Sequence, residues 1–227
     1  MNRLNLEVVE RDGRLTPLVA GIEQVLVAGY TGRDRASVLA HIDELEKLGV
    51  APPPRVPMVY VLDSGSLTTA PTIQVWSSKT SGEIEFCLIP TDGGTFVAVG
   101  SDHTDREQET VDVEGSKRLC PHPISRQVWR YEDVRDRWDE LTIRSWNTDD
   151  SGRHLYQEGT LESFLSVESL LEEVRAAGHA NLSGRLIFGG TVPTLSGFIY
   201  GSRFEAELRD PGLGRALECA YDVTLDG

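Results

Sequence analysis

The chain has 227 residues, of which 39% are hydrophobic, and a formal net charge of −14. This length fits one large domain, and the acidic balance disfavours binding to the phosphates of nucleic acids. No apolar run is long enough to span a membrane, and the first residues carry no apolar signal core, so we expect a cytoplasmic protein without a membrane partner. Cys87, Cys120 and Cys219 form no CxxC pair and are interpreted as reduced thiols.

Short apolar runs separated by turn residues predict a chain that is mostly β. The predicted strands lie at 4–10, 22–28, 57–62, 71–76, 83–89, 94–99, 185–190, 203–209 and 216–225. Helices are predicted over 32–48, 131–140 and 166–177. Thr31 can cap the first helix, with Asp34 three residues later in a capping-box arrangement, and Ser166 can cap the last. A few helices beside many strands indicate the α+β class.

Three carboxylates near the middle of the chain indicate a cation site. Glu83 and Glu85 are two residues apart in the predicted strand 83–89, so their side chains share one face. Asp102 follows the next predicted strand. Adjacent negative charges repel, and three carboxylates make an all-oxygen ligand set that suits Mg²⁺, Mn²⁺ or Ca²⁺. The alternative is that Glu83 and Glu85 lie on the solvent face of an ordinary amphipathic strand.

His41 and Glu44 lie three residues apart in the first predicted helix, which makes them neighbours on its surface. A carboxylate beside a histidine can fix the orientation of the imidazole and let it act as a general base near neutral pH. The alternative is a surface pair without a catalytic role.

Several segments, in order, resemble motifs of the fumarylacetoacetate hydrolase superfamily. His41 and Glu44 match the HxxE pair of its N-terminal segment, which is similar to VAGYTGRDRASVLAHIDELEKLGVAPPPRVPMVYVLDSGSL. GEIEFCLI resembles the family's ExE metal strand, and SDHTDRE resembles its NDxSxRD motif. GSKRLCPHPIS resembles the family's GKxxDxxxPxGP segment, and LYQEGTLESFLSVESLLEEV resembles its NGxxxQ segment. IFGGTVP resembles its TGTP turn. The resemblance covers about residues 22 to 226 and is strongest to a bacterial branch of unknown function, DUF2848.

This resemblance implies a rolled mixed β-sheet with peripheral helices, in which 1–21 is an N-terminal strand appendage and 22–227 is the catalytic domain. It implies metal ligation by Glu83, Glu85 and Asp102, with Mg²⁺ or Mn²⁺ as the ion and Ca²⁺ as an alternative. It implies catalytic roles for His41, Glu44 and Lys117, and substrate contacts by Arg106, Gln157, Gly190 and Thr191. The alternatives are a solvated loop lysine at Lys117, a turn residue at Thr191, and an ion pair of Arg106 with Glu107 or Asp105. The resemblance, together with strand edges that need cover, also predicts a homodimer.

The activity that the resemblance implies is metal-dependent hydrolysis of a carbon–carbon bond in a 2-oxo or β-diketo acid, with His41 activating a water. Decarboxylation or keto–enol isomerisation on the same site is the nearest alternative. The chain departs from the family pattern at four positions, namely Ser101 for asparagine, Asp105 for a small residue, Leu62 for lysine, and Gly189 in GGT for TGT. The changes at Leu62 and Gly189 favour a further alternative, a non-catalytic ligand-binding protein.

Overall fold

A computed structural model describes residues 1–47 and 52–226 of the chain. Strands dominate, as predicted. The strands are β1 (Asn2–Val9), β2 (Leu15–Ile22), β3 (Gln24–Gly29), β4 (Met58–Asp63), β5 (Leu67–Thr68), β6 (Thr72–Val75), β7 (Thr80–Ser81), β8 (Ile84–Thr91), β9 (Gly94–Ser101), β10 (Thr104–Asp105), β11 (His122–Pro123), β12 (Gln127–Arg130), β13 (Thr142–Asp149), β14 (Gly152–Thr160), β15 (Arg185–Phe188), β16 (Arg203–Asp210) and β17 (Arg215–Leu225). The helices are α1 (Arg35–Lys47), α2 (Arg106–Glu109), α3 (Val113–Arg118), α4 (Tyr131–Val134) and α5 (Val167–Ala176), with 3₁₀ turns η1 (Ser64–Ser66), η2 (Arg135–Glu140) and η3 (Leu161–Ser163).

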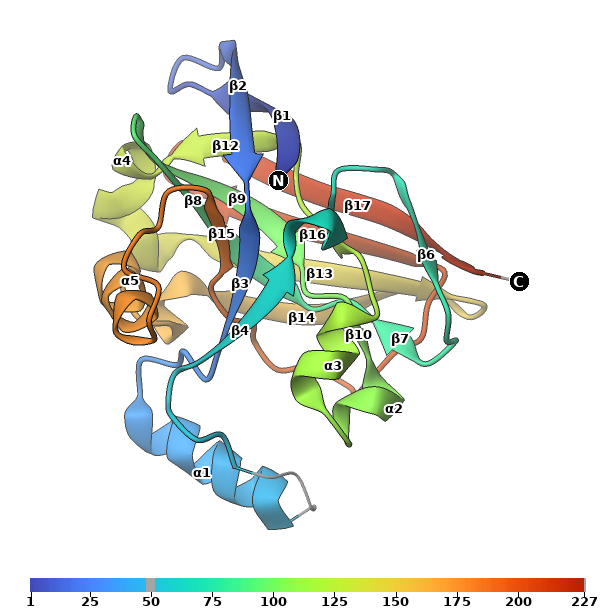
Figure 1. The fold of residues 1–227 in the computed structure, drawn as a ribbon. Coiled ribbons are helices and arrows are strands. Elements are labelled where there is room, and N and C mark those ends of the chain that lie inside the picture. Colours follow the sequence, from blue (N-terminus) through green and yellow to red (C-terminus); the bar gives the residue numbers. More distant parts are fainter. Residues whose placement is uncertain (48–51, 227) are drawn as a thin grey trace.

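Two mixed sheets form the body of the protein. The larger sheet has eight strands in the order β2-β1-β12-β9-β8-β15-β3-β4, and the smaller has five in the order β14-β13-β16-β17-β6. Parallel pairs occur at β1–β12, β15–β3 and β17–β6, and the other neighbours are antiparallel. Helix α1 extends away from this body at the bottom of the view in Figure 1, whereas α2 and α3 lie beside the ends of β7 and β10. The predicted α+β architecture with a curled mixed sheet is confirmed.

The central strands β8 and β9 are buried on both faces. Phe86 and Leu88 face one side, where they pack with side chains of the smaller sheet such as Leu208. Cys87 and Ile89 face the other side, in a second cluster with residues of β1 and β3. Because both faces are covered, a polar side chain on β8 must find its partners inside the protein. This requirement applies directly to Glu85.

Helix α1 begins later than predicted. It starts at Arg35, because the carboxylate of Asp34 accepts hydrogen bonds from the N–H of Ala36 (2.9 Å) and the hydroxyl of Ser37 (2.7 Å) and so caps the helix. The capping role predicted for Thr31 is wrong, since its hydroxyl instead donates to the carbonyl of Gly189. The predicted end of the helix, at residue 48, lies outside the described residues.

The other two predicted helices differ in outcome. Helix α5 follows the prediction, because the Ser166 hydroxyl accepts from the N–H of Ser169. The helix predicted over 131–140 is α4 followed by η2, with a kink at Arg137, which has φ −126°. No helix in the described ranges is long and apolar enough to cross a membrane. At the N-terminus, β1 pairs with β2 and, in parallel, with β12, so these strands extend the larger sheet.

Candidate functional site

The register of β8 and β9 brings the three predicted metal ligands to one face of the larger sheet. Ile84 pairs with Ser101, and the N–H of Asp102 donates to the carbonyl of Glu83 at 3.0 Å. Glu83 and Asp102 therefore lie opposite each other, and Glu85 lies two residues along on the same face. Directly opposite side chains have Cβ atoms about 5 Å apart, and diagonal neighbours lie about 7–8 Å apart.

Glu85 is buried, and a backbone donor is held against it. Burial and then the charge of Asp102 raise the pKa of Glu85 well above its usual range. The N–H of Gly190 donates to Oε2 of Glu85 at 2.7 Å. Gly190 has φ +118°, and a Cβ at this position would lie 2.1 Å from Oγ1 of Thr31. Thr31 in turn donates to the carbonyl of Gly189, so the GGT turn is fixed with a backbone N–H pointing at Glu85.

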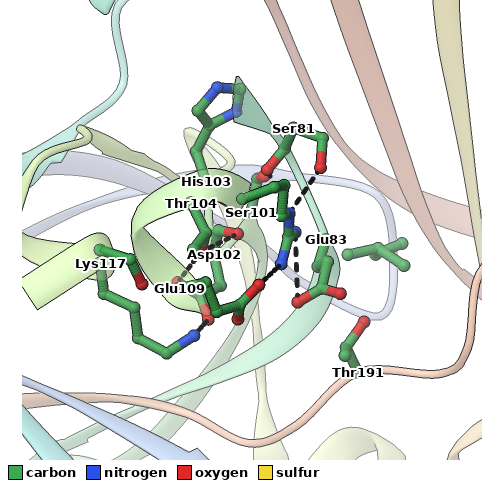
Figure 2. A network of polar contacts seen from close by, with 12 residues as sticks. Ser81, Glu83, Ser101, Asp102, His103, Thr104, Glu109, Lys117 and Thr191 are labelled. Carbon is green, nitrogen blue, oxygen red and sulfur yellow. Dashed lines mark hydrogen bonds and ion pairs between the residues drawn. The ribbon is translucent and has the colours of Figure 1, made fainter. Parts of the chain in front are cut away.

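Asp102 is held by three side chains. The ammonium group of Lys117, on α3, contacts Oδ2, as Figure 2 shows. Nε2 of His122 lies 3.1 Å from Oδ1, and the hydroxyl of Thr104 donates to the same oxygen at 3.3 Å. Burial alone raises the pKa of Asp102, but the charge of Lys117 and the hydrogen bond from His122 outweigh it, so the pKa lies below its usual range. Asp102 is therefore ionised in the folded protein.

Arg106 is buried and forms ion pairs with two carboxylates. Its Nη1 contacts Glu109 at 2.8 Å, its Nη2 lies 3.4 Å from Glu83, and its Nε donates to the hydroxyl of Ser81 at 2.7 Å. Burial by itself lowers the pKa of Arg106, but the charges of Glu83 and Glu109 outweigh this effect and raise the pKa above its usual range. The guanidinium therefore stays charged. Its guanidinium also lies 4.5 Å from the ring centroid of Phe198. A substrate contact by Arg106 stays a prediction, while its observed contacts are structural.

The ion-pair partners expected for Arg106 were wrong. Asp105 instead caps α2, where its carboxylate accepts from the N–H groups of Glu107 (3.0 Å) and Gln108 (3.1 Å). The partner three residues along the chain is Glu109, one helical turn from Arg106, which is the spacing that brings side chains together on a helix.

The site carries more negative than positive charge. Its carboxylates are Glu83, Glu85, Asp102 and Glu109, and its fixed cations are Arg106 and Lys117. With every group ionised, four against two would leave an excess of two negative charges. Burial and then the charge of Asp102 raise the pKa of Glu85, so Glu85 ionises readily only when a further positive charge lies beside it.

A divalent cation is the group that would neutralise this excess. No three His, Cys, Asp or Glu side chains within the described ranges are already placed to hold a metal ion, because Asp102 is turned to Lys117 and Glu83 to Arg106. Each carboxylate oxygen has two lone pairs, however, and the single hydrogen bond described on Glu85 uses only one of them. An all-carboxylate set that outnumbers the cations beside it fits Mg²⁺ or Mn²⁺ in its chemistry.

Lys117 is a cation in this site and not a base. Its ammonium group is buried, which by itself lowers the pKa, but the carboxylates of Asp102, Glu109 and Glu83 raise it above its usual range. The ammonium also lies 5.8 Å from the ring centroid of Tyr60. The alternative interpretation of Lys117 as a solvated loop residue does not hold, because its side chain is only 7% exposed.

Gln157 is buried, and both ends of its amide are used. Its Oε1 accepts from the N–H of Ile84 and the hydroxyl of Ser145, both at 2.9 Å, and its Nε2 donates to Oγ1 of Thr191 at 2.8 Å and to the carbonyl of Val192 at 2.6 Å. Gln157 therefore ties the start of β8 to the GGT turn. These contacts position Thr191, and its predicted substrate contact stays a prediction.

The predicted base pair cannot be placed in the site. Helix α1 includes His41 and Glu44, but their side chains lie outside the described residues, so their roles stay predictions. Leu62, which stands where the family has a lysine, is a core residue and is 2% exposed. No cation therefore reaches the site from that position.

Two site residues were missed from the sequence. His122 lies in a two-residue strand that pairs with β5, and Glu109 lies in a one-turn helix. Neither element has a periodic pattern long enough to recognise, and the contacts of His122 depend on long-range pairing. The spacing of Arg106 and Glu109, three residues apart as on one helical turn, is the one signal that could have found Glu109.

Comparisons with other proteins agree with this fold. Residues 28–221 match the family described as "Protein of unknown function (DUF2848)". No curated protein compared with the chain matches it. Among solved structures, a fumarylacetoacetate hydrolase family protein from Yersinia pestis CO92 is similar with a TM-score of 0.64 at 13% identity, covering 96% of this chain and 100% of that one. The 2-hydroxyhepta-2,4-diene-1,7-dioate isomerase from Mycobacterium marinum is similar with a TM-score of 0.62 at 18% identity, covering 95% and 82%. A 2-keto-3-deoxyarabinonate dehydratase gives 0.64 at 14% identity, covering 94% and 77%. The chain therefore belongs to the DUF2848 family and has the fold of fumarylacetoacetate hydrolase proteins.

Proposed function

We propose that the protein is a divalent-metal-dependent enzyme that hydrolyses a carbon–carbon bond in a 2-oxo or β-diketo acid. The observation that carries the proposal is the set of three carboxylates on one face of β8 and β9, which outnumber the two cations beside them, Arg106 and Lys117. Similar structures include proteins named as an isomerase of an unsaturated dioic acid and as a dehydratase of a 2-keto acid. These names support a substrate with an oxo or enol group beside a carboxylate.

Glu83, Glu85 and Asp102 would hold Mg²⁺ or Mn²⁺. When bound, such an ion polarises a carbonyl oxygen and stabilises negative charge that develops on it. Lys117 keeps its proton, so its ammonium group adds a fixed positive charge beside Oδ2 of Asp102. The hydrogen bond from Gly190 fixes Glu85, and Gln157 fixes the turn that carries Gly190 and Thr191.

His41 and Glu44 would supply the base that activates water in this proposal. The segment that carries them is joined to the rest of the site at its start. The carbonyl of Thr31 accepts from the N–H of Leu165 at 2.9 Å, and Arg33 pairs with both carboxylate oxygens of Asp139 at 2.6 and 2.8 Å. The entry to α1 is therefore anchored beside the GGT turn. His41 would take a proton from water, and Glu44 would orient the imidazole.

Metal binding is tested by calorimetry on chelator-treated protein titrated with Mn²⁺. Binding is expected for the wild type, with loss in Glu83→Ala, Glu85→Gln and Asp102→Asn. Glu114→Gln is the matched control, because among the described residues Glu114 pairs with Arg118 alone, on the exposed side of α3. Unchanged affinity in all three site variants would remove the metal assignment.

The reaction is tested with a panel of 2-oxo and β-diketo acids, with and without Mg²⁺, by measuring pyruvate and CO₂ separately. Pyruvate without CO₂ supports hydrolysis of an acylpyruvate. Release of CO₂ would identify a decarboxylase on the same site, and loss of enol absorbance without either product would identify an isomerase. Ligand-induced thermal stabilisation without turnover of any compound would identify a binding protein.

A further inference from the structure

His122 is a buried histidine whose imidazole has one described polar partner. It lies in β11, which pairs in parallel with β5 through Leu67, and its side chain is fully buried. The ring packs against Phe188, with centroids 5.7 Å apart and planes at 70°. Its Nε2 lies 3.1 Å from Oδ1 of Asp102, and its Nδ1 is buried with no hydrogen-bond partner among the described residues. The packing therefore fixes the ring with Nε2 directed at Asp102.

The direction of this hydrogen bond follows from the state of the carboxylate. An ionised carboxylate can only accept hydrogen bonds. Both oxygens of Asp102 face other donors, the ammonium group of Lys117 and the hydroxyl of Thr104, so Nε2 of His122 carries the hydrogen and donates it to Oδ1.

The contact limits how the Asp102 carboxylate can turn. Thr104 also donates to Oδ1, while Lys117 contacts Oδ2. The ammonium group of Lys117 ends a flexible four-carbon stem and can follow the carboxylate if it rotates. The imidazole of His122 cannot follow it, because the side chain is fully buried, its ring packs against Phe188 and its backbone is paired with β5. His122 is thus the rigid member of the group that sets the orientation of Asp102.

We propose that His122 is a positioning residue for cation binding. It holds Oδ1 of Asp102, so that Oδ2, which contacts Lys117, is the oxygen left for a cation bound with Glu83 and Glu85. This inference rests on the proposed metal site. Hydrogen bonds to ligating carboxylates typically change metal affinity about 10- to 100-fold when they are removed, because they pre-orient the ligand.

The test compares Mn²⁺ affinity, measured by calorimetry and by the electron paramagnetic resonance signal of free Mn²⁺, across four variants. His122→Leu fills the same space without a donor and is expected to weaken binding about 10- to 100-fold. His122→Gln places an amide N–H near the position of Nε2 and is expected to restore most of the affinity. His122→Asn reaches only the position of Nδ1 and is expected to bind as weakly as the leucine variant.

Ile124→Ala is the control for packing. Ile124, two residues along the chain, is buried in the cluster that contains Phe188, and its aliphatic side chain cannot hydrogen-bond to Asp102. It is expected to lower the urea midpoint without changing Mn²⁺ affinity. If His122→Leu does not fold, the difference between the glutamine and asparagine variants decides the question.

Two results would overturn the inference, and they are distinguishable. If the wild type and the His122→Leu variant bind Mn²⁺ with affinities within about twofold, the metal site stands and the positioning role is wrong. Equal affinities of the glutamine and asparagine variants have the same meaning. If the wild type binds no Mn²⁺, the proposed metal function fails and the role of His122 falls with it.

Discussion

The backbone N–H of Gly190 donates a 2.7 Å hydrogen bond to Oε2 of Glu85, although the two residues lie 105 positions apart in the chain. This bond joins the GGT turn after β15 to the central strand β8. It also places a neutral donor against a buried carboxylate whose pKa is raised. A backbone donor can approach this closely because Gly190 has no side chain and adopts φ +118°.

Gly190→Ala is therefore expected to destabilise the protein by about 1–3 kcal/mol, from strain at positive φ and from the clash with Thr31. Urea denaturation followed by circular dichroism measures the change. Gly197→Ala is the matched control, because Gly197 also has positive φ (+80°) but nothing lies within 4 Å of its would-be Cβ. Equal losses in the two variants would show that the close approach to Thr31 has no energetic consequence.

Tyr221→Phe is expected to lower the free energy of unfolding by about 1–3 kcal/mol, the usual cost of leaving a buried polar group without its partner. The hydroxyl of Tyr221, on β17, lies 2.7 Å from Oγ of Ser101 and 2.8 Å from Nδ1 of His103. These residues flank Asp102 and face the smaller sheet. Burial lowers the pKa of His103 to about 3, so the imidazole is neutral and needs this partner at neutral pH.

The control for this substitution is Tyr200→Phe, which alters an exposed tyrosine. The urea midpoint of the Tyr200 variant is expected to match the wild type. A Tyr221→Phe variant with the same midpoint as the wild type would mean that the hydroxyl does not stabilise the contact between the two sheets.

The loss of folding stability at acid pH should depend on Asp210. Burial raises the pKa of Asp210, but hydrogen bonds from Arg137 (2.9 Å) and from the N–H of Leu213 (3.1 Å) outweigh it and lower the pKa. A pKa below the unfolded value of about 3.9 stabilises the fold above that pH, and this stabilisation is lost as pH falls through the folded-state pKa. Asp210→Asn is expected to lose about 1–3 kcal/mol near pH 7 and progressively less below about pH 4.

Urea denaturation across this pH range gives the measurement, with Asp136→Asn as the control. The side chain of Asp136 is 82% exposed and, within the described part of the chain, pairs with Arg135 alone, so the urea midpoint of this variant should follow the wild type at each pH. A constant difference between wild type and Asp210→Asn from neutral to acid pH would contradict the assignment.

His41→Ala is expected to lower turnover about 10²-fold or more on an identified substrate, as for the loss of a general base, while Mn²⁺ affinity is retained. Glu44→Gln should have a smaller effect, because this residue only orients His41. The control is Asp43→Ala, which changes an exposed residue of the same helix. Near-wild-type turnover in His41→Ala would mean that His41 and Glu44 are a surface pair without a catalytic role.

A homodimer is predicted from the family resemblance and from strand edges that need cover. Light scattering coupled to size exclusion at micromolar concentration should give twice the chain mass of 25.0 kDa. A mass of one chain at that concentration would refute the prediction.

The strands whose pattern could be recognised from the sequence have continuous apolar faces. In β8, every residue from Ile84 to Ile89 is buried, and the same-face position of Glu83 and Glu85 follows from alternation alone. The hairpin of β13 and β14 was missed because its inward face is partly polar. Ser145 and Asn147 point inward, where they donate to Oε1 of Gln157 and to the carbonyl of Ile199. Alternation of hydrophobicity disappears when buried positions are small polar residues with internal partners.

The site contacts that could not be predicted join residues distant in sequence. Asp102 was identified as a ligand candidate from its position after a strand, but its hydrogen bond with His122 depends on the pairing of β5 with β11. The bond from Gly190 to Glu85 depends on β15 lying beside β8. Local periodicity carries no information about which strands become neighbours, so these contacts become visible only in the folded chain.

The antiparallel pairing of β3 with β4 has a consequence for how members of this fold can diverge. Gly29 at the end of β3 is paired with Met58 at the start of β4, so the connection that carries α1 leaves and re-enters the sheet within about 5 Å, one strand spacing. Its length and sequence can change at little cost in closure entropy and without altering the register of any strand. The scaffold that holds the carboxylates and the segment that carries His41 are thus separable units, and α1 can change while the register of the sheet stays the same.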